Sequence, residues 1–132
     1  MKGLGRHILA EIYDCNGEIL DNLKLIEKIM VDAAIKAGAE VKKVAFHKFC
    51  PQGVSGVVVI SESHLAIHTW PELGYAAVDV FTCGDNVDPW VACRYITKHF
   101  NAGHITATEV KRGIFKTKQE RNYCSSKKSA CL

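Results

Sequence analysis

The sequence lacks the long apolar segments that would carry a chain into or across a membrane. None of its uninterrupted apolar runs approaches the roughly 20 residues that a membrane-spanning helix needs. The N-terminal stretch MKGLGRHILAEIYDC carries Glu11 and Asp14 where a signal peptide would keep its apolar region. We therefore expect a cytoplasmic protein with no membrane partner.

The net charge is also small. Charged residues make up 23% of the chain, and the formal net charge is only +3. Much of the lysine and arginine falls after Glu109, where no aromatic stacking platform accompanies it. Binding to nucleic acid is therefore not expected, and residues 114–132 are predicted to form a basic, flexible tail.

Cysteine pairs at metal-binding or redox spacing are absent. The cysteines are Cys15, Cys50, Cys83, Cys93, Cys124 and Cys131, which are unevenly spaced and form no CxxC motif. Nothing in the sequence signals secretion, so free thiols are favoured over a disulfide framework.

Apolar patterning, in contrast, is well developed and describes one domain. A chain of 132 residues that is 48% apolar can bury a single core and is too short for two domains of ordinary size. We place this domain at residues 1–113. The patterns predict strands at 7–15, 39–49, 53–63, 64–70, 75–83 and 104–112, and helices at 16–38 and 89–100.

This order of elements favours an α+β fold. The expected form is a two-layer α/β sandwich, in which an antiparallel sheet carries two helices on one face. The other face then needs a cover, and in a chain this small a second copy of the chain is the expected one. The sequence therefore predicts a homodimer.

Unusual chemistry is concentrated in VVVISESHLAIHTWPE, residues 57–72, which starts like a buried strand and then carries serines and two histidines. If residues 57–70 formed one extended strand, Ser63 and His68 would point to opposite faces. A bulge or turn near Ser63 would break this alternation. Taken alone, these polar groups fit ordinary solvated strand residues equally well.

Two chemical alternatives fit this stretch poorly. His64 and His68 have the HxxxH spacing of helical zinc sites, but they lie in a predicted strand and lack the glutamate of HExxH. A serine hydrolase would need GxSxG, and GVSGV at residues 53–57 has its glycines at the wrong spacing. The sequence therefore predicts neither a metal site nor a hydrolase.

The longer segment GVSGVVVISESHLAIHTWPELGYAAVDVFTCGD strongly resembles the core of the small, pyruvoyl-dependent S-adenosylmethionine decarboxylase proenzymes of bacteria and archaea. The resemblance extends to GRHILAEIYDC before this core and to DPWVACRYI after it, and only the tail after Gly113 falls outside it. The family implies a chain that cuts its own backbone between Glu62 and Ser63, giving a β chain 1–62 and an α chain 63–132.

The resemblance also implies the chemistry of the cut. The Ser63 hydroxyl attacks the Glu62 carbonyl and turns the amide into an ester, and β-elimination then expels the carboxylate. Dehydroalanine remains, tautomerises and loses ammonia by hydrolysis, which leaves a covalent pyruvoyl group at residue 63. This group forms a Schiff base with the substrate amine and accepts electrons as CO2 leaves, so neither pyridoxal phosphate nor a metal is expected.

Roles for further residues follow from the same resemblance. His68 matches the base of the elimination step, which suits an imidazole that titrates near neutrality. Ser55 matches a serine that assists processing, although a turn serine between two glycines remains an alternative. Cys83 matches the thiol that protonates the product carbanion. The other five cysteines have no matching role, and we take them as core or surface residues.

Substrate binding is implied for Phe49, Trp70 and Glu72. Aromatic faces suit a sulfonium and an adenine, and a carboxylate suits the ribose hydroxyls. Ordinary packing explains Phe49 and Trp70 equally well.

Three functions remain open at this level. The first is decarboxylation of S-adenosylmethionine to the aminopropyl donor for spermidine biosynthesis, by a homodimer of processed protomers that share sites near their interface. The second is a pyruvoyl-dependent arginine or ornithine decarboxylase of the same fold, because the processing motif does not select the substrate. The third is an unprocessed interaction protein, against which intact Ser63, His68 and Cys83 argue.

Overall fold

Strands and helices follow one another along the chain in the predicted order. A computed structural model describes residues 3–61 and 63–115. The strands are β1 Gly5–Tyr13, β2 Val41–Lys48, β3 Val54–Ile60, β4 Ser63–Trp70, β5 Tyr75–Cys83 and β6 His104–Arg112; the helices are α1 Gly17–Leu20, α2 Leu23–Lys36, the 3-10 turn η1 Pro71–Leu73 and α3 Pro89–His99. Glu62 and residues 116–132 of the predicted tail lie outside the described residues.

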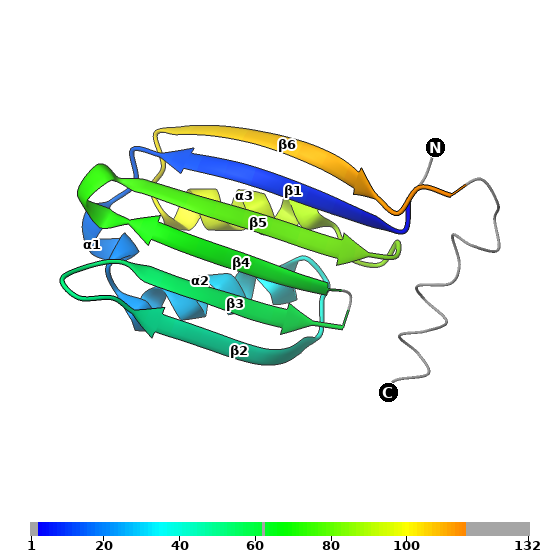
Figure 1. Cartoon of the computed structure of the whole chain (residues 1–132), viewed down its shortest axis with the longest axis horizontal. Coiled ribbons are helices and arrows are strands. Elements are labelled where there is room, and N and C mark those ends of the chain that lie inside the picture. The colour runs from blue at the N-terminus through cyan, green and yellow to red at the C-terminus, as the bar shows by residue number, and fades with distance from the viewer. Residues whose placement is uncertain (1–2, 62, 116–132) are drawn as a thin grey trace.

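The strands form one six-stranded sheet in the order β2-β3-β4-β5-β1-β6 (Figure 1). Every pair of neighbours is antiparallel. Strand β1, the first in the chain, lies between β5 and β6, so the two halves of the chain are joined into one sheet.

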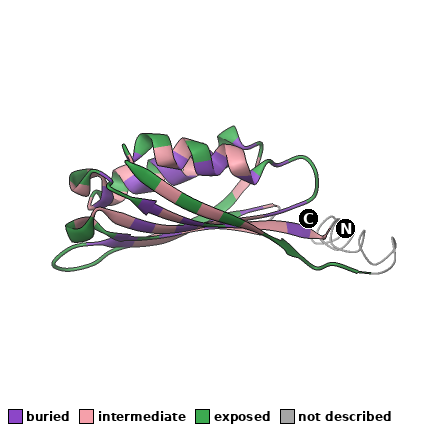
Figure 2. Ribbon diagram, turned by 90° about the horizontal axis from the view of Figure 1, so that it is seen from above, coloured by how far each residue is buried: buried purple, intermediate pink, exposed green. Residues whose placement is uncertain are grey.

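Both long helices cover the same face of this sheet, and Figure 2 shows the opposite face bare. Alternate strand residues point toward the helices and are fully or almost fully buried there: Ile8, Ala10, Ile12, Val54, Val58, Leu65, Ile67, Val78 and Val80. They pack against the apolar side of α2, including Ile26 and Met30, and against Ile96 of α3. The predicted α+β sandwich with two helices on one face is confirmed.

Capping side chains explain where the helices begin. The Asp88 carboxylate accepts a hydrogen bond from the backbone N–H of Trp90, and Pro89 follows as the first helical residue of α3, as predicted. The single helix expected at 16–38 is instead two helices. Asn22 caps a fresh start by accepting from the Leu25 N–H at 3.1 Å, and this divides α1 from α2. Gly38, with φ +96°, ends α2 as predicted.

Ile60 and Ser63 are the last paired residues of β3 and β4, so residues 57–70 contribute two antiparallel strands and not one extended strand. The face alternation considered for a single strand therefore does not apply between β3 and β4. Ser63 has φ +131°, a backbone conformation that residues with a side chain rarely adopt. The expected departure from regular β geometry is confirmed at this residue.

The bare face of the sheet is named here the open face. It carries Ser55, Val57 and Val59 from β3, His64, Ala66, His68 and Trp70 from β4, Tyr75, Ala77, Asp79, Phe81 and Cys83 from β5, and His7, Leu9, Glu11 and Tyr13 from β1. Several of its apolar side chains are exposed, Leu9, Tyr13, Val59 and Trp70 among them. Of the helices in the described ranges, none has the length and hydropathy to cross a membrane.

Candidate active site

Ser55 and His68 form a hydrogen-bonded pair at one end of the open face. They are direct cross-strand partners in the register of β3 and β4, and Ser55 Oγ lies 2.7 Å from His68 Nδ1. Both side chains reach solvent, His68 being exposed. The imidazole is therefore oriented by the serine and open to a reacting group that approaches the sheet.

The predicted substrate-binding residues lie at the same end of the sheet. The Trp70 ring stacks on Tyr75 with 5.2 Å between ring centroids, yet 40% of Trp70 is exposed. Phe49 follows directly after β2, meets His47 edge to face at 4.6 Å, and is 46% exposed. Exposed aromatic faces of this kind can stack on a planar ligand.

Glu72 lines a polar cavity of about 570 Å³. Asp21 and Gln52 line the same cavity. A second cavity, of about 590 Å³, lies between α3 and β6 and is lined by none of the predicted site residues.

Asp21 anchors the loop that carries Phe49. Its Oδ1 accepts from the backbone N–H of Gly53 at 2.8 Å and lies 2.8 Å from Nζ of Lys48, which also donates to the Phe49 carbonyl. The hydrogen bond from Lys48, followed by that from Gly53, lowers the pKa of Asp21. The loop is thus tied to the segment before α2 by a carboxylate that stays ionised at neutral pH.

Ser63 and Cys83 occupy the other end of the sheet. Ser63 is paired with Thr82 across β4 and β5, and Cys83 is the next residue along β5. Cys83 is 5% exposed and takes part in a disulfide. The expectation of free thiols is confirmed for Cys15, Cys50 and Cys93 and is wrong for Cys83.

The predicted site residues therefore fall into two half-sites in one chain. The serine half-site holds Ser63 and Cys83, together with Thr82, which was not predicted and lies opposite Ser63. The histidine half-site holds Ser55 and His68, with the aromatic residues nearby. Ser63 and His68 are at opposite ends of β4, which spans Ser63–Trp70. Five residues of extended strand correspond to roughly 16 Å, so a single chain does not bring the two half-sites together.

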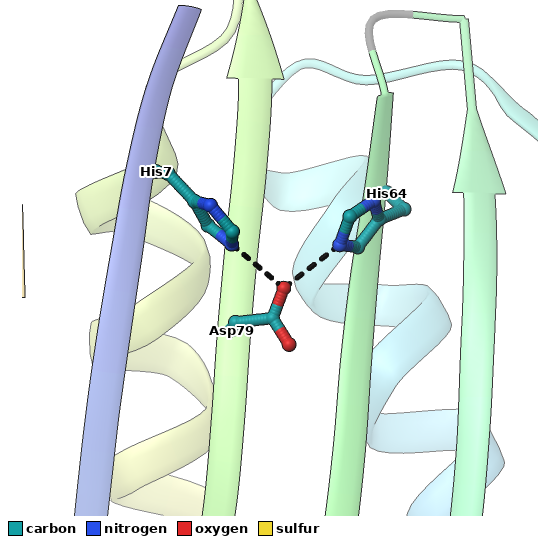
Figure 3. Close-up of side chains that lie close together, drawn as sticks. All are labelled: His7, His64 and Asp79. Carbon is teal, nitrogen blue, oxygen red and sulfur yellow. Dashed lines mark hydrogen bonds and ion pairs between the residues drawn. The ribbon is translucent and has the colours of Figure 1, made fainter. Parts of the chain in front are cut away.

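A row of polar side chains crosses the open face near the serine half-site (Figure 3). Asp79 Oδ2 lies 2.8 Å from His7 Nε2 and 2.7 Å from His64 Nε2. Arg112 Nη1 lies 3.0 Å from His7 Nδ1. Because a guanidinium can only donate, His7 Nδ1 accepts and its Nε2 carries the proton donated to Asp79.

His7, His64 and Asp79 have the ligand types of a metal site, and their ligand atoms lie within 4.8 Å of one another. The hydrogen bonds oppose such a site. A metal at His7 Nε2 would have to replace the proton on that nitrogen while Nδ1 still accepts from Arg112, and the Arg112 charge would repel the cation. The sequence analysis did not predict this row of polar side chains. The signal for it was Asp79, a carboxylate within the apolar strand segment AAVDVF.

The fold and the two half-sites together define a class of small α+β proteins. In this class a strained serine is the first residue of one strand, and the neighbouring strand carries a cysteine. The chain belongs to the S-adenosylmethionine decarboxylase family, whose model matches residues 6–113.

Similar proteins cover nearly all of the chain. The S-adenosylmethionine decarboxylase proenzyme of Clostridium kluyveri is 76% identical over 115 residues, which make up 87% of this chain and 91% of that protein. The proenzyme of Acetivibrio thermocellus is also 76% identical, over 87% of this chain and 93% of its own. The crystal structure of the adenosylmethionine decarboxylase from Aquifex aeolicus superposes with a TM-score of 0.84 at 36% identity, covering 89% of this chain and 98% of that one. The resemblance inferred from the motifs is confirmed.

Proposed function

We propose that this protein is made as a proenzyme, cuts itself between Glu62 and Ser63, and then decarboxylates S-adenosylmethionine. The names of the relatives support the overall activity. The observation that carries the site of the cut is the backbone of Ser63, whose φ of +131° is strained for a residue with a side chain. In this proposal residues 1–113 form the domain, and the cut divides the protein into chains 1–62 and 63–132.

Serine is the residue type that such processing requires. Its hydroxyl can accept the acyl group of Glu62, and the resulting ester oxygen is a leaving group on Cβ. Ser63 is only partly buried, so a base that approaches the end of the strand can reach this residue. The covalent pyruvoyl group formed at this position would act as an electron sink when CO2 leaves, with no pyridoxal phosphate or metal required.

A homodimer would complete the site. The base proposed for the elimination, His68, is roughly 16 Å from Ser63 along β4 in the same chain. If two open faces pack together about a two-fold axis that runs across the strands, each serine half-site meets the histidine half-site of the partner subunit. Such an isologous interface would also cover the exposed apolar side chains of the open face.

Within the completed site the residues have separate tasks. Ser55 orients the His68 imidazole, which removes the α-proton of Ser63 during processing. Cys83, as the reduced thiol, donates a proton to the product carbanion. Phe49 and Trp70 hold the adenosyl and sulfonium groups, and Glu72 accepts hydrogen bonds from the ribose hydroxyls. The product is the aminopropyl donor for spermidine biosynthesis in the cytoplasm.

Mass spectrometry of the purified protein tests the cut. We expect two chains divided between Glu62 and Ser63, the second of them without a free amine, and no cut in Ser63→Ala. A wild-type chain that stays whole after long incubation would overturn the proposal. Release of labelled CO2 from S-adenosylmethionine, but not from arginine or ornithine, tests the substrate.

Complementation tests the shared site. His68→Ala and Ser63→Ala are each expected to stay uncut alone. Mixed dimers of the two variants should cut the His68→Ala chain, because its intact Ser63 meets His68 of the partner subunit. If mixed dimers form and neither chain is cut, the two half-sites do not act between subunits.

A further inference from the structure

Thr82 carries a buried hydroxyl that has no hydrogen-bond partner among the residues the structure describes. Thr82 is 1% exposed and is the second-to-last residue of β5. Burying a hydroxyl without a partner costs about 1–3 kcal/mol, and native proteins keep few such groups. Valine has nearly the same shape and would avoid this cost, so the hydroxyl calls for a functional explanation.

The register of the sheet points to that explanation. Thr82 is the direct cross-strand partner of Ser63. Side chains of directly opposed residues in an antiparallel pair lie on the same face, with Cβ atoms about 5 Å apart. Two hydroxyls at that separation come within hydrogen-bond reach after small side-chain rotations. The side chains of Thr82 and Cys83 point to opposite faces of β5.

We propose that the Thr82 hydroxyl takes part in self-processing as a hydrogen-bond donor to the Ser63 side-chain oxygen during β-elimination. This inference rests on the proposed function and adds a residue to it. In the ester, the base removes the α-proton of Ser63, the C–H electron pair becomes the Cα=Cβ double bond, and the Cβ–Oγ bond breaks. The electron pair of the Cβ–Oγ bond stays on the oxygen, which departs as part of the new C-terminal main-chain carboxylate of Glu62.

A donor aimed at that oxygen stabilises the charge as it develops. The oxygen bears little charge in the ester and a shared full charge in the departing carboxylate, so the hydrogen bond strengthens along the reaction. An unpaired hydroxyl in the proenzyme is what this task needs, because no existing hydrogen bond has to break first. The two neighbours on β5 then have different tasks, Thr82 in processing and Cys83 in decarboxylation.

The decisive variant is Thr82→Val, which removes the hydroxyl and keeps the shape. We expect self-processing to slow by roughly a hundred-fold, as for the loss of one donor in an oxyanion hole, while the melting temperature of the uncut chain stays the same or rises. The ester should accumulate, so hydroxylamine should cut the variant and release a second chain that begins with serine. Thr82→Ser restores the hydroxyl and should restore processing.

Comparison with the wild type in the same experiment separates this inference from the proposed function. A wild-type chain that does not cut itself refutes the proposed function. If the wild type cuts, a Thr82→Val chain that processes at the same rate overturns the role of Thr82. A slow variant without a hydroxylamine-sensitive ester overturns the assigned step, and a variant with a markedly lower melting temperature shows a structural role instead.

Discussion

Ser55 and His68 face each other across β3 and β4, with 2.7 Å between the serine Oγ and the imidazole Nδ1. The same strand that places His68 beside Ser55 carries it away from Ser63, at the other end of β4. The hydrogen bond within the histidine half-site is therefore local, whereas the chemistry proposed for it crosses between subunits.

Ser55→Ala should slow self-processing by about ten-fold. The variant removes the partner that orients the imidazole, and loss of one such hydrogen bond corresponds to about 1.4 kcal/mol in a barrier. The rate of the cut is measured by gel electrophoresis of freshly purified protein. Ser61→Ala is the control, since Ser61 lies in the turn after β3 and its hydroxyl only reaches Glu40 at 3.4 Å. Equal rates for Ser55→Ala and the wild type would contradict the orienting role.

Asp21→Asn should raise the KM for S-adenosylmethionine several-fold and leave kcat nearly unchanged. Asparagine keeps the size but loses the charge that holds Lys48, so the loop of Phe49 loosens while the reacting groups stay in place. Steady-state CO2 release measures both constants. Asp32→Asn, at an exposed pair with Lys28 on α2, is the matched control and should change neither. A fall in kcat alone would show that Asp21 acts elsewhere.

Asp79→Ala should destabilise the protein by about 1–3 kcal/mol. His7 and His64 both donate to this one carboxylate, so its removal leaves two partly buried N–H groups without their acceptor. Urea unfolding measures the loss. His64→Gln is the comparison, because glutamine still offers an N–H to Asp79, and it should cost less than His64→Ala. Nitrogen chemical shifts of the imidazoles should show the His7 proton on Nε2.

Cys83→Ala should cut itself normally, but its rate of decarboxylation should fall by a factor of roughly 10²–10⁴. This factor is the usual contribution of a positioned general acid. The wild type should be active only with Cys83 reduced, because a disulfide sulfur has no proton to donate. Activity lost on treatment with an oxidant and regained with dithiothreitol would agree with this role. Normal turnover by Cys83→Ala would remove Cys83 from it.

Glu109→Gln should lower stability at neutral pH by up to about 1 kcal/mol, and the difference should vanish in acid. Arg6 binds this carboxylate through two nitrogens, at 3.1 and 2.9 Å, and Trp90 Nε1 donates to it at 2.7 Å. The hydrogen bond from Arg6 is the main cause that lowers its pKa.

The sign of this pH dependence follows from the lowered pKa. A carboxylate with a lowered folded pKa stabilises the fold at pH values above its unfolded pKa, and this contribution is lost as the pH falls through the folded value, which lies below 4.5. Urea unfolding of both proteins at neutral and acidic pH measures it. Glu40→Gln, at an exposed pair with Lys42, is the control and should show a smaller difference. A difference that persists at low pH would contradict the assignment.

The local pattern of apolar and polar residues was enough to predict most strands and helices of this fold. Alternating apolar residues such as Ile8, Ala10 and Ile12 predicted a strand with one buried face, and Asp88 followed by Pro89 predicted the start of α3. The sequence analysis did not predict the division of the first helix at Asn22. An asparagine can occupy the interior of a helix or cap its N-terminus, and only the hydrogen bond that its side chain makes distinguishes the two positions.

The chemistry-bearing residues were visible in the sequence, but their arrangement was not. The family resemblance implied that Ser63 and His68 act together, whereas strand geometry holds them toward opposite ends of β4. Asp79 and Thr82 gained their significance only from partners on other strands, His7 and Ser63 respectively, at separations that no local pattern encodes.

The sequence by itself determined which segments bury one face, that the two long helices share one side of an antiparallel sheet, and the family through its motif from Gly53 to Asp85. Those properties depend on interactions between residues close in the chain and on residue types. The tertiary structure alone decided that the predicted site residues lie toward two ends of the sheet and that Thr82 opposes Ser63. Register between strands depends on how the whole sheet packs, and that packing leaves the open face uncovered and holds Ser63 and His68 toward opposite ends of β4.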